Sequence, residues 1–245
     1  ETTVNYNRDV EIFPVLNTIF EKIYGESPYK SPTDMGVNMA GNCICDDEAC
    51  REASKQEIIR RYFDALNALA KGSTSEKEAQ KIELLMNMAG ITVTDRKVVI
   101  KALERAKETD GPAAALELRD GRIITGKTTN LLGASAALLL NVLKVLAGID
   151  HELHVISPDA IHPIQQLKTK YLGSKNPRLH IDEILIALSM SAATSDAARL
   201  ALEQIPNLRG CQVHTSVMLS DVDVISFRKL GVELTCEAKA EKKQK

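Results

Sequence analysis

Eight consecutive residues, Gly121 to Thr128, match the phosphate-binding pattern G-x-x-x-x-G-K-[ST] letter for letter. A working phosphate loop needs a strand that ends at the first glycine, a helix that starts near the lysine, and backbone N–H groups that turn inward. The intervening residues include Ile123 and Ile124, and two adjacent β-branched side chains favour an extended strand. Asp120-Gly121 is a common hairpin turn. We therefore interpret the match as a β-hairpin, with a nucleotide-binding loop as the alternative.

A second stretch, residues 173–180, gathers polar side chains that suit an anionic ligand. Its candidate ligand-binding residues are Lys175, Asn176, Arg178 and His180, and a helix is expected to begin directly after them. Arginine binds phosphate or carboxylate through two parallel hydrogen bonds, and lysine adds a point charge. The alternative is a solvated basic loop that holds no ligand.

Two further patches are candidates for ligand binding. Thr128, Thr129 and Asn130 lie where a buried helix is expected to begin, and helix N-termini attract anions. Asp34 and Asn38 lie in a segment rich in Gly, Pro, Asn and Asp, which suits either a network of turns or a ligand-binding loop. Composition alone leaves both possibilities open.

Motifs for metal binding and for covalent catalysis are weak or missing. Cys43, Cys45 and Cys50 supply three thiols without paired zinc spacing or a nearby histidine, so we expect no metal site. The five histidines include no pair at i, i+4 spacing, and the sequence has no G-x-S-x-G serine elbow. The sequence therefore identifies no catalytic residue and no cofactor.

The composition of the 245 residues, 44% hydrophobic and 26% charged, is typical of a soluble protein. A net charge of −2 gives no attraction to nucleic acid or to an anionic membrane, and nine aromatic residues (four Phe, five Tyr, no Trp) are too few for a base-stacking surface. No stretch reads as a membrane span or a signal peptide. Five cysteines without framework spacing indicate reduced thiols, so we expect a cytoplasmic protein. Because the chain opens with Glu1 rather than Met, we expect a portion of a longer protein.

Residues 1–110 are predicted to form a helical subdomain. Apolar residues recur at helical spacing, and glycines end the segments. The helices are expected over 9–24, 47–70, 75–90 and 94–109. The stretch between the first two is expected to be irregular because Pro28 and Pro32 interrupt helices. Asp110-Gly111-Pro112 is a strong break, and we place the domain boundary there.

Residues 111–238 are predicted to form a three-layer α/β/α sandwich with a mixed sheet, followed by a charged tail over 239–245. The helix expected over 130–147 is apolar nearly all round, so other elements should cover both of its sides. The remaining helices are expected over 158–171, 182–193, 195–205 and 221–230. Strands are expected over 113–118, 122–125, 154–157, 211–219 and 232–236.

Several long strings resemble an uncharacterised bacterial family known as domain of unknown function eighteen forty-six. They are ETTVNYNRDVEIFPVLN, SPTDMGVNMAGNCI, REASKQEIIRRY, LLGASAALLLN, LGSKNPRLH and LRGCQVHTSV. The resemblance runs from Glu1 to about Cys236 and implies that this chain is the C-terminal portion of a larger protein, whose upstream part carries its own glycine-rich segment. Some members are labelled ATP-dependent peptidases, but no residue of this portion supports that label.

The second half also resembles the cytidine-deaminase-like topology, in which a hairpin and a buried helix precede further strand–helix units. Zinc deaminases begin the buried helix with His-x-Glu or Cys-x-Glu, and a later helix supplies Cys-x-x-Cys. Here the helix begins with Leu131-Leu-Gly-Ala-Ser135, and the chain has no Cys-x-x-Cys. Deaminase catalysis is therefore excluded even where the topology is shared, because fold alone does not confer function.

Two interpretations of function remain. In the first, the chain is a ligand-binding and assembly portion of a cytosolic multidomain protein, and it binds a phosphate-bearing or carboxylate small molecule. In the second, it is part of a nucleotide- or phosphate-dependent enzyme whose site is completed by an absent N-terminal portion or by another subunit. A homo-oligomer is a possible assembly, whereas neither nucleic acid nor a membrane is an expected partner.

Overall fold

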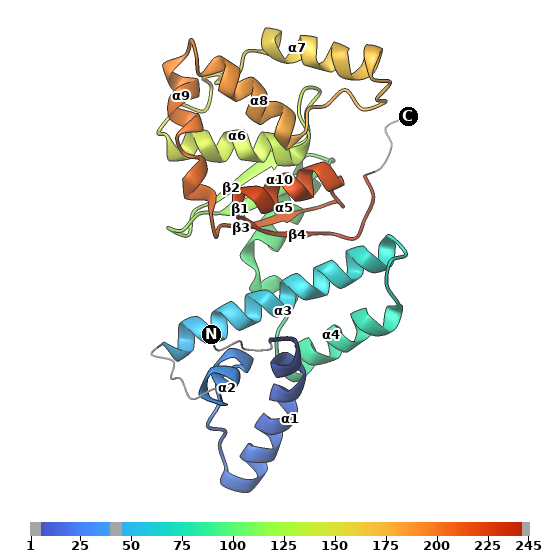
Figure 1. Cartoon of the computed structure of the whole chain (residues 1–245), viewed down its shortest axis with the longest axis vertical. Helices are drawn as coiled ribbons and strands as arrows, with labels where there is room; N and C mark the ends of the chain where they lie inside the picture. The colour runs from blue at the N-terminus through green and yellow to red at the C-terminus, as the bar shows by residue number, and fades with distance from the viewer. Residues whose placement is uncertain (1–5, 40–45, 242–245) are drawn as a thin grey trace. The chain divides into compact units, whose positions relative to one another are not determined.

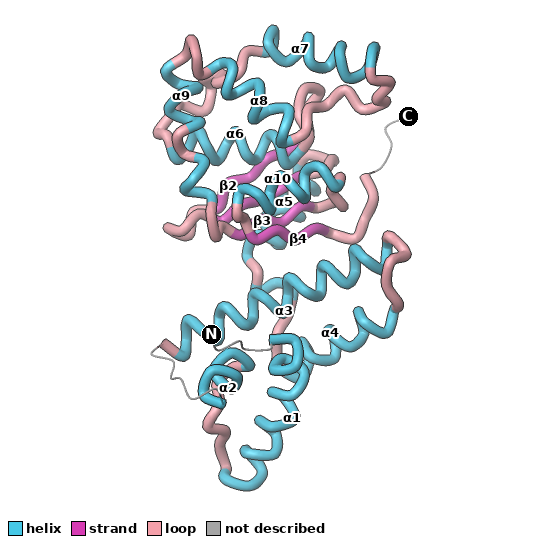
Figure 2. Tube along the Cα trace, viewed as in Figure 1, coloured by secondary structure: helices cyan, strands magenta, loops and turns pink. Residues whose placement is uncertain are grey.

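The computed structural model describes residues 6–39 and 46–241, and the chain divides into two compact units, Glu1–Arg96 and Lys97–Lys245. Figures 1 and 2 show helices alone in the first unit and helices around a sheet in the second. None of the helices in the described ranges is long and apolar enough to cross a membrane.

The first unit contains four α-helices and one short 3₁₀ turn within the described residues. They are α1 (Tyr6–Tyr24), α2 (Pro32–Met39), α3 (Asp47–Ala70), α4 (Glu76–Met88) and η1 (Val93–Asp95). The pairs α1–α2 and α3–α4 pack together, and Met35, Ile58, Ile59 and Phe63 are buried between the helices.

Helix α2 was missed by the sequence analysis, which expected an irregular segment there. Pro32 is the first residue of this helix, where a missing N–H costs no hydrogen bond and the fixed φ suits the first turn. The Ser31 hydroxyl accepts a hydrogen bond from the Asp34 amide at 3.0 Å and so caps the helix start. The expectation was therefore wrong because it treated proline only as a helix breaker.

A mixed four-stranded sheet forms the centre of the second unit, in the order β2-β1-β3-β4. The strands are β1 (Ala113–Glu117), β2 (Ile123–Lys127), β3 (Gln212–Thr215) and β4 (Glu233–Cys236). Strand β1 is antiparallel to both neighbours, whereas β3 and β4 are parallel and are joined through α10 (Asp221–Leu230). The predicted mixed α/β fold is confirmed at this level.

Helices cover both faces of the sheet. Ala115 packs with Val98 and Ala102 of α5 (Lys97–Glu108), whereas Ala114 and Leu116 point to the opposite face and join the main core. That core is shared with α6 (Ala134–Leu146), α8 (Ile181–Ser191), α9 (Asp196–Leu202) and α10. Helix α5 therefore belongs with the sheet, although the sequence analysis grouped it with the helices before residue 110.

The remaining elements of this unit are α7 (Pro158–Gln166), a π-helical turn η2 (Leu167–Tyr171) and a 3₁₀ turn η3 (Ile205–Leu208). The strand predicted over 154–157 does not form, and these residues are irregular. Val155 and Ile156 are nevertheless buried in the main core. A short apolar run that fills a core can therefore resemble a strand in sequence without pairing with one.

The hairpin predicted from the phosphate-loop match is confirmed. Strands β1 and β2 pair from Ala113–Lys127 to Glu117–Ile123, and Gly121 has a φ of 82° in the connecting turn. Gly126 lies against α6 so closely that an added Cβ would lie 2.3 Å from the Leu138 amide nitrogen. The second glycine of the pattern therefore allows strand–helix packing, and it does not line a phosphate cradle.

We expect Gly126→Ala to lower the free energy of unfolding by about 1–3 kcal/mol, because the new methyl group collides with the backbone of α6. Urea denaturation of the two proteins measures this change. Gly133→Ala is the matched control at the start of the same helix, where the nearest atom to an added Cβ is 3.7 Å away and φ is −66°. That control should cost less than about 1 kcal/mol, and equal losses for both variants would contradict the packing role of Gly126.

Candidate ligand-binding site at the carboxyl end of the sheet

Three strands end at the same end of the sheet. Because β1 alone runs in the opposite direction, the last residues of β2, β3 and β4 (Lys127, Thr215 and Cys236) lie together. We call this the carboxyl end of the sheet. In open α/β sheets, ligands bind in the crevice outside the carboxyl ends of strands.

Two segments that the sequence analysis singled out lie side by side at this end. The Leu179 amide donates to the Leu131 carbonyl at 2.9 Å, and the Gly133 amide donates to the Leu179 carbonyl at 3.2 Å. In addition, Arg178 Nε donates to the Thr129 carbonyl at 3.0 Å. The fold therefore joins residues 128–133 to residues 178–180.

The sequence analysis expected Thr128, Thr129 and Asn130 at the start of the buried helix. That expectation was wrong, because α6 begins only at Ala134. The Thr129 hydroxyl accepts hydrogen bonds from the Leu131 and Leu132 amides. The Asn130 carbonyl accepts one from Gln165, and the Thr128 amide donates to Pro112. These contacts shape the connection between β2 and α6.

The start of α6 lacks a side-chain cap. Gly133 is the N-cap residue and offers no side-chain acceptor to the first amides of this 13-residue helix. Ser135, in the first turn, is only 3% exposed, and its hydroxyl has no hydrogen-bond partner within the described residues. Sequence reasoning missed Ser135, although a glycine in the capping position followed by a serine was a visible signal.

Arg178 is the best-placed cation of this site. Its side chain is 17% exposed, and Nη1 donates to Oε1 of Glu241 at 2.7 Å. Asn176 supports it, because Asn176 Oδ1 accepts a hydrogen bond from the Arg178 amide at 3.1 Å. Lys175, between the two, is exposed.

His180 forms a hydrogen-bonded pair with Asp223, a residue that sequence reasoning missed. His180 Nδ1 donates to Asp223 Oδ2 at 2.9 Å, while Asp223 Oδ1 accepts from the Ile181 amide at 2.9 Å. The hydroxyl of Ser220, the N-cap residue of α10, also donates to Asp223 at 3.1 Å. The pair therefore links the first turns of α8 and α10.

This pair shifts the pKa of both members. The hydrogen bond to Asp223 raises the pKa of His180 above the ordinary histidine value. Burial opposes ionisation of Asp223, but the hydrogen bonds from His180 and Ile181 outweigh it and lower the pKa of this carboxyl group. The charged form of each residue thus stabilises the charged form of the other.

Lys168 and Glu183 lie next to this pair. Lys168 is buried, and its ammonium donates to Glu183 Oε2 at 2.7 Å and to the Arg178 carbonyl at 2.6 Å. The same Glu183 oxygen accepts the His180 amide at 2.7 Å. The charge of Lys168 is therefore compensated by Glu183, and Lys168 positions the 178–180 backbone.

The arrangement can bind an anion and exchange a proton. Arg178 supplies a partly exposed cation, and the uncapped start of α6 supplies amide dipoles. Because Nδ1 of His180 is held by Asp223, Nε2 is the ring nitrogen left to exchange a proton.

Asp34 and Asn38 lie in the first unit and are described with it. Asp34 is buried, and its Oδ2 accepts the Lys30 amide at 2.7 Å, so it braces a turn. Asn38 is part of α2. Of the cysteine cluster, Cys43 and Cys45 lie outside the described residues. Within residues 6–39 and 46–241, no group of three or more His, Cys, Asp or Glu side chains could hold a metal ion.

Lys127→Ala should leave any ATP affinity of this chain unchanged. Lys127 is an exposed residue at the end of β2, and the preceding residues are paired with β1 rather than wrapped around phosphates. Isothermal titration calorimetry with ATP and magnesium compares the variant with the unmodified chain. A clear loss of ATP binding in the variant would restore the nucleotide-loop interpretation.

The His180–Asp223 pair should make stability depend on pH. The raised His180 pKa adds stability that is complete below the unfolded histidine pKa and is lost as pH rises through the folded pKa. The lowered Asp223 pKa adds stability above the unfolded aspartate pKa, which is lost as pH falls through the folded pKa. The pair is therefore most stabilising between about pH 4 and pH 6.5.

Urea unfolding of Asp223→Asn at pH 5 and pH 9 tests this dependence, and the loss of stability should be larger at pH 5. NMR titration should also show a lower His180 pKa in the variant. Lys168 and Glu183, which also face His180, are present in both proteins. The control is Asp182→Asn, which replaces an exposed carboxylate in the first turn of α8. This variant should lose the same free energy of unfolding at both pH values. A pH-independent cost for Asp223→Asn would contradict the charge coupling.

Comparison with known proteins identifies the chain's relatives. "Domain of unknown function DUF1846, C-terminal" matches residues 94–245, and "Domain of unknown function DUF1846, N-terminal" matches residues 1–90. The "UPF0371 protein" of Corynebacterium aurimucosum is 59% identical over 237 residues, which cover 97% of this chain and 48% of that protein. The "UPF0371 protein" of Streptococcus thermophilus strain LMD-9 is 54% identical over 235 residues, 96% of this chain and 48% of that protein.

The chain thus spans about half the length of the curated relatives it matches. The two family models together cover nearly all of its residues, and their division between residues 90 and 94 lies close to the division between the two compact units. These matches confirm the resemblance that the sequence strings indicated. The chain belongs to the DUF1846 family.

Proposed function

We propose that the α/β unit binds a small molecule through a phosphate or carboxylate group at the carboxyl end of the sheet. One observation carries the proposal. The residue before α6, Gly133, is bonded to Leu179, whose sequence neighbours are Arg178 and His180. This helix start has no side-chain cap, and the buried Ser135 hydroxyl in its first turn has no hydrogen-bond partner among residues 6–39 and 46–241. Helix-start amides without a side-chain cap, a hydroxyl and a cation together suit an anionic group.

The contact of Arg178 with Glu241 supports the same proposal. The guanidinium is oriented by the Thr129 carbonyl and already holds a carboxylate oxygen at 2.7 Å. The Glu241 carboxylate is 40% exposed, so a ligand anion can take its place at the guanidinium.

A second candidate function is an enzyme that acts on such a ligand, and the His180–Asp223 pair favours it. A histidine oriented by a carboxylate, with Nε2 left for proton exchange, is the arrangement of a general base or acid. The remaining half of the longer relatives would then supply further groups. The relation to cytidine-deaminase-like topology is supported by the hairpin, the buried α6 and the β3–α10–β4 unit, and the missing strand at 154–157 weighs against it.

The predictions of a homo-oligomer and of a cytoplasmic location rest on the sequence alone. The proposed ligand site requires neither of them, because all of its described residues come from one chain.

Thermal-shift and calorimetric titrations with inorganic phosphate, pyrophosphate and citrate test the anion site. We expect at least one of these probes to stabilise the unmodified chain, and Arg178→Ala to weaken its affinity at least tenfold. Ser135→Ala should weaken it less, because the amides of α6 remain.

Arg122→Ala is the matched control. Arg122 is also paired with a carboxylate, that of Asp120, but it lies at the hairpin turn, at the opposite end of the sheet. Its replacement should leave the affinity unchanged. The proposal fails if no probe binds, if Arg178→Ala binds as well as the unmodified chain, or if Arg122→Ala loses as much.

A further inference from the structure

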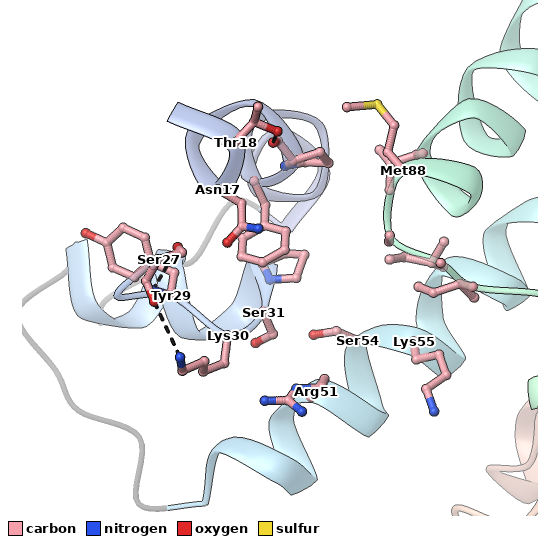
Figure 3. Close-up of a pocket in the computed structure, with 18 of the residues that line it drawn as sticks. Asn17, Thr18, Ser27, Tyr29, Lys30, Ser31, Arg51, Ser54, Lys55 and Met88 are labelled. Carbon is pink, nitrogen blue, oxygen red and sulfur yellow. Dashed lines mark hydrogen bonds between the residues drawn. The ribbon is translucent and has the colours of Figure 1, made fainter. Parts of the chain in front are cut away.

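The first unit contains a cavity that the proposed function does not use. Its volume is about 800 Å³, and it lies between α1, the turn at residues 25–32, α3 and the end of α4 (Figure 3). This volume is within the range of small-molecule pockets, about 300–1,000 Å³. All of its lining residues belong to one compact unit.

One wall of the cavity is a face of α3. Arg51, Ser54, Lys55 and Ile58 line the cavity at i, i+3, i+4 and i+7 spacing, so they project from the same side of the helix. This face changes along its length from cationic to apolar. Ile58 is 2% exposed, whereas the Arg51 side chain is 49% exposed.

The turn that supplies Lys30 is fixed by buried polar groups. The Ser27 hydroxyl accepts the Tyr29 amide at 3.2 Å, and Asp34 Oδ2 accepts the Lys30 amide at 2.7 Å. Ser31, which is 1% exposed, accepts the Asp34 amide. The backbone that presents Lys30 is therefore preorganised.

Two of the three cations that line the cavity have only weak partners. Lys30 Nζ lies 3.4 Å from the Ser27 carbonyl, and Arg51 pairs with Glu48 in an exposed i, i+3 contact. Lys55 is more strongly compensated, by Glu52 at 2.6 Å and by the charge of Asp95. Lys30 and Arg51 are thus the two cations most available to a ligand, and Figure 3 shows Ser31 and Ser54 directed toward each other beside them.

The lining also contains three carboxylates. Two of them have partners, since Glu21 accepts a hydrogen bond from Asn17 at 2.7 Å and Asp95 accepts the Thr92 amide at 2.7 Å. The third, Glu26, is in the turn after α1. None of the three is on the α3 face that carries Arg51.

Apolar side chains complete the cavity. They come from α1, α3, α4 and the residue after Gly90, namely Phe13, Ile58, Leu85, Met88 and Ile91. Ile58 and Leu85 are buried, so this part of the lining is less solvated than the part around Lys30 and Arg51. The lining thus combines an apolar part with a cationic, hydroxyl-bearing part.

We propose that this cavity is a second ligand site, which takes an organic molecule with one anionic group and an apolar body. The anionic group contacts Lys30, Arg51 and the nearby Ser hydroxyls, and the apolar body packs on Ile58 and Leu85. This site is independent of the proposed anion site in the α/β unit.

Two fluorescent probes with the same aromatic body test the proposal on the full chain. 8-Anilinonaphthalene-1-sulfonate carries a negative charge, and N-phenyl-1-naphthylamine is its neutral counterpart. We expect the sulfonate to bind more tightly than the neutral probe. Lys30→Ala/Arg51→Ala should lower the affinity for the sulfonate at least fivefold and leave the affinity for the neutral probe unchanged. The double variant should keep the turn intact, because the Lys30 backbone amide makes the hydrogen bond to Asp34.

Ala89→Trp should weaken both probes, because this exposed residue lines the cavity and a ring there fills part of it. Circular dichroism and thermal midpoints establish that each variant is folded, and Ala89→Trp alters no residue that is buried or paired by its side chain. If the double variant is unstable, Ala89→Trp alone therefore still tests whether the probes bind in this cavity.

Two controls separate this site from other sites. Lys22→Ala/Lys77→Ala makes the same change of charge in the same unit at exposed residues outside the lining, and it should leave both affinities unchanged. Arg178→Ala should also leave both probe affinities unchanged. A failure of the proposed anion site in the α/β unit can therefore be distinguished from a failure of the cavity site. Equal binding of the two probes, an unaffected Ala89→Trp, or an equal loss in either control overturns the proposal.

Discussion

The contact between Gly126 of β2 and the backbone of α6 governs the architecture of the second unit. Only a glycine allows Leu138 to approach the strand this closely, and the resulting packing places a nearly all-apolar helix against the inner face of the sheet. Once α6 is fixed there, its first turn must lie at the carboxyl end of the sheet. The 178–180 segment can then pair with the residues that lead into the helix.

The sequence predicted well what local chemistry determines. Asp120-Gly121 and the two isoleucines that follow specify the hairpin, and helices α3 and α10 begin and end where capping residues and periodicity placed them. The apolar stripe of α5 was also visible, but which surface it covers depends on Ala115, a contact that local pattern does not reveal. For this reason the sequence analysis placed the boundary after α5, near residue 110, whereas the two compact units divide between Arg96 and Lys97.

The candidate site was only partly predictable for the same reason. Arg178 and His180 stood out because their residue types suit anions, and both lie at the carboxyl end of the sheet. Asp223, the partner that sets the charge of His180, is 43 positions away and was not identified. The cavity of the first unit collects side chains from four segments, some of them distant in sequence. Its turn at residues 25–32 ends at Pro32, the first residue of α2, which the sequence analysis took for a helix breaker.

Leu179 has a consequence for motion at the proposed anion site. Its amide and its carbonyl are both bonded to the chain that leads into α6, so Arg178 and His180 are fixed to the folded scaffold on either side of it. The segment cannot swing away as a hinged flap without breaking both bonds. Entry and exit of a ligand would therefore depend on rotamer changes of individual side chains, which take picoseconds to nanoseconds when exposed, rather than on the slower opening of a loop.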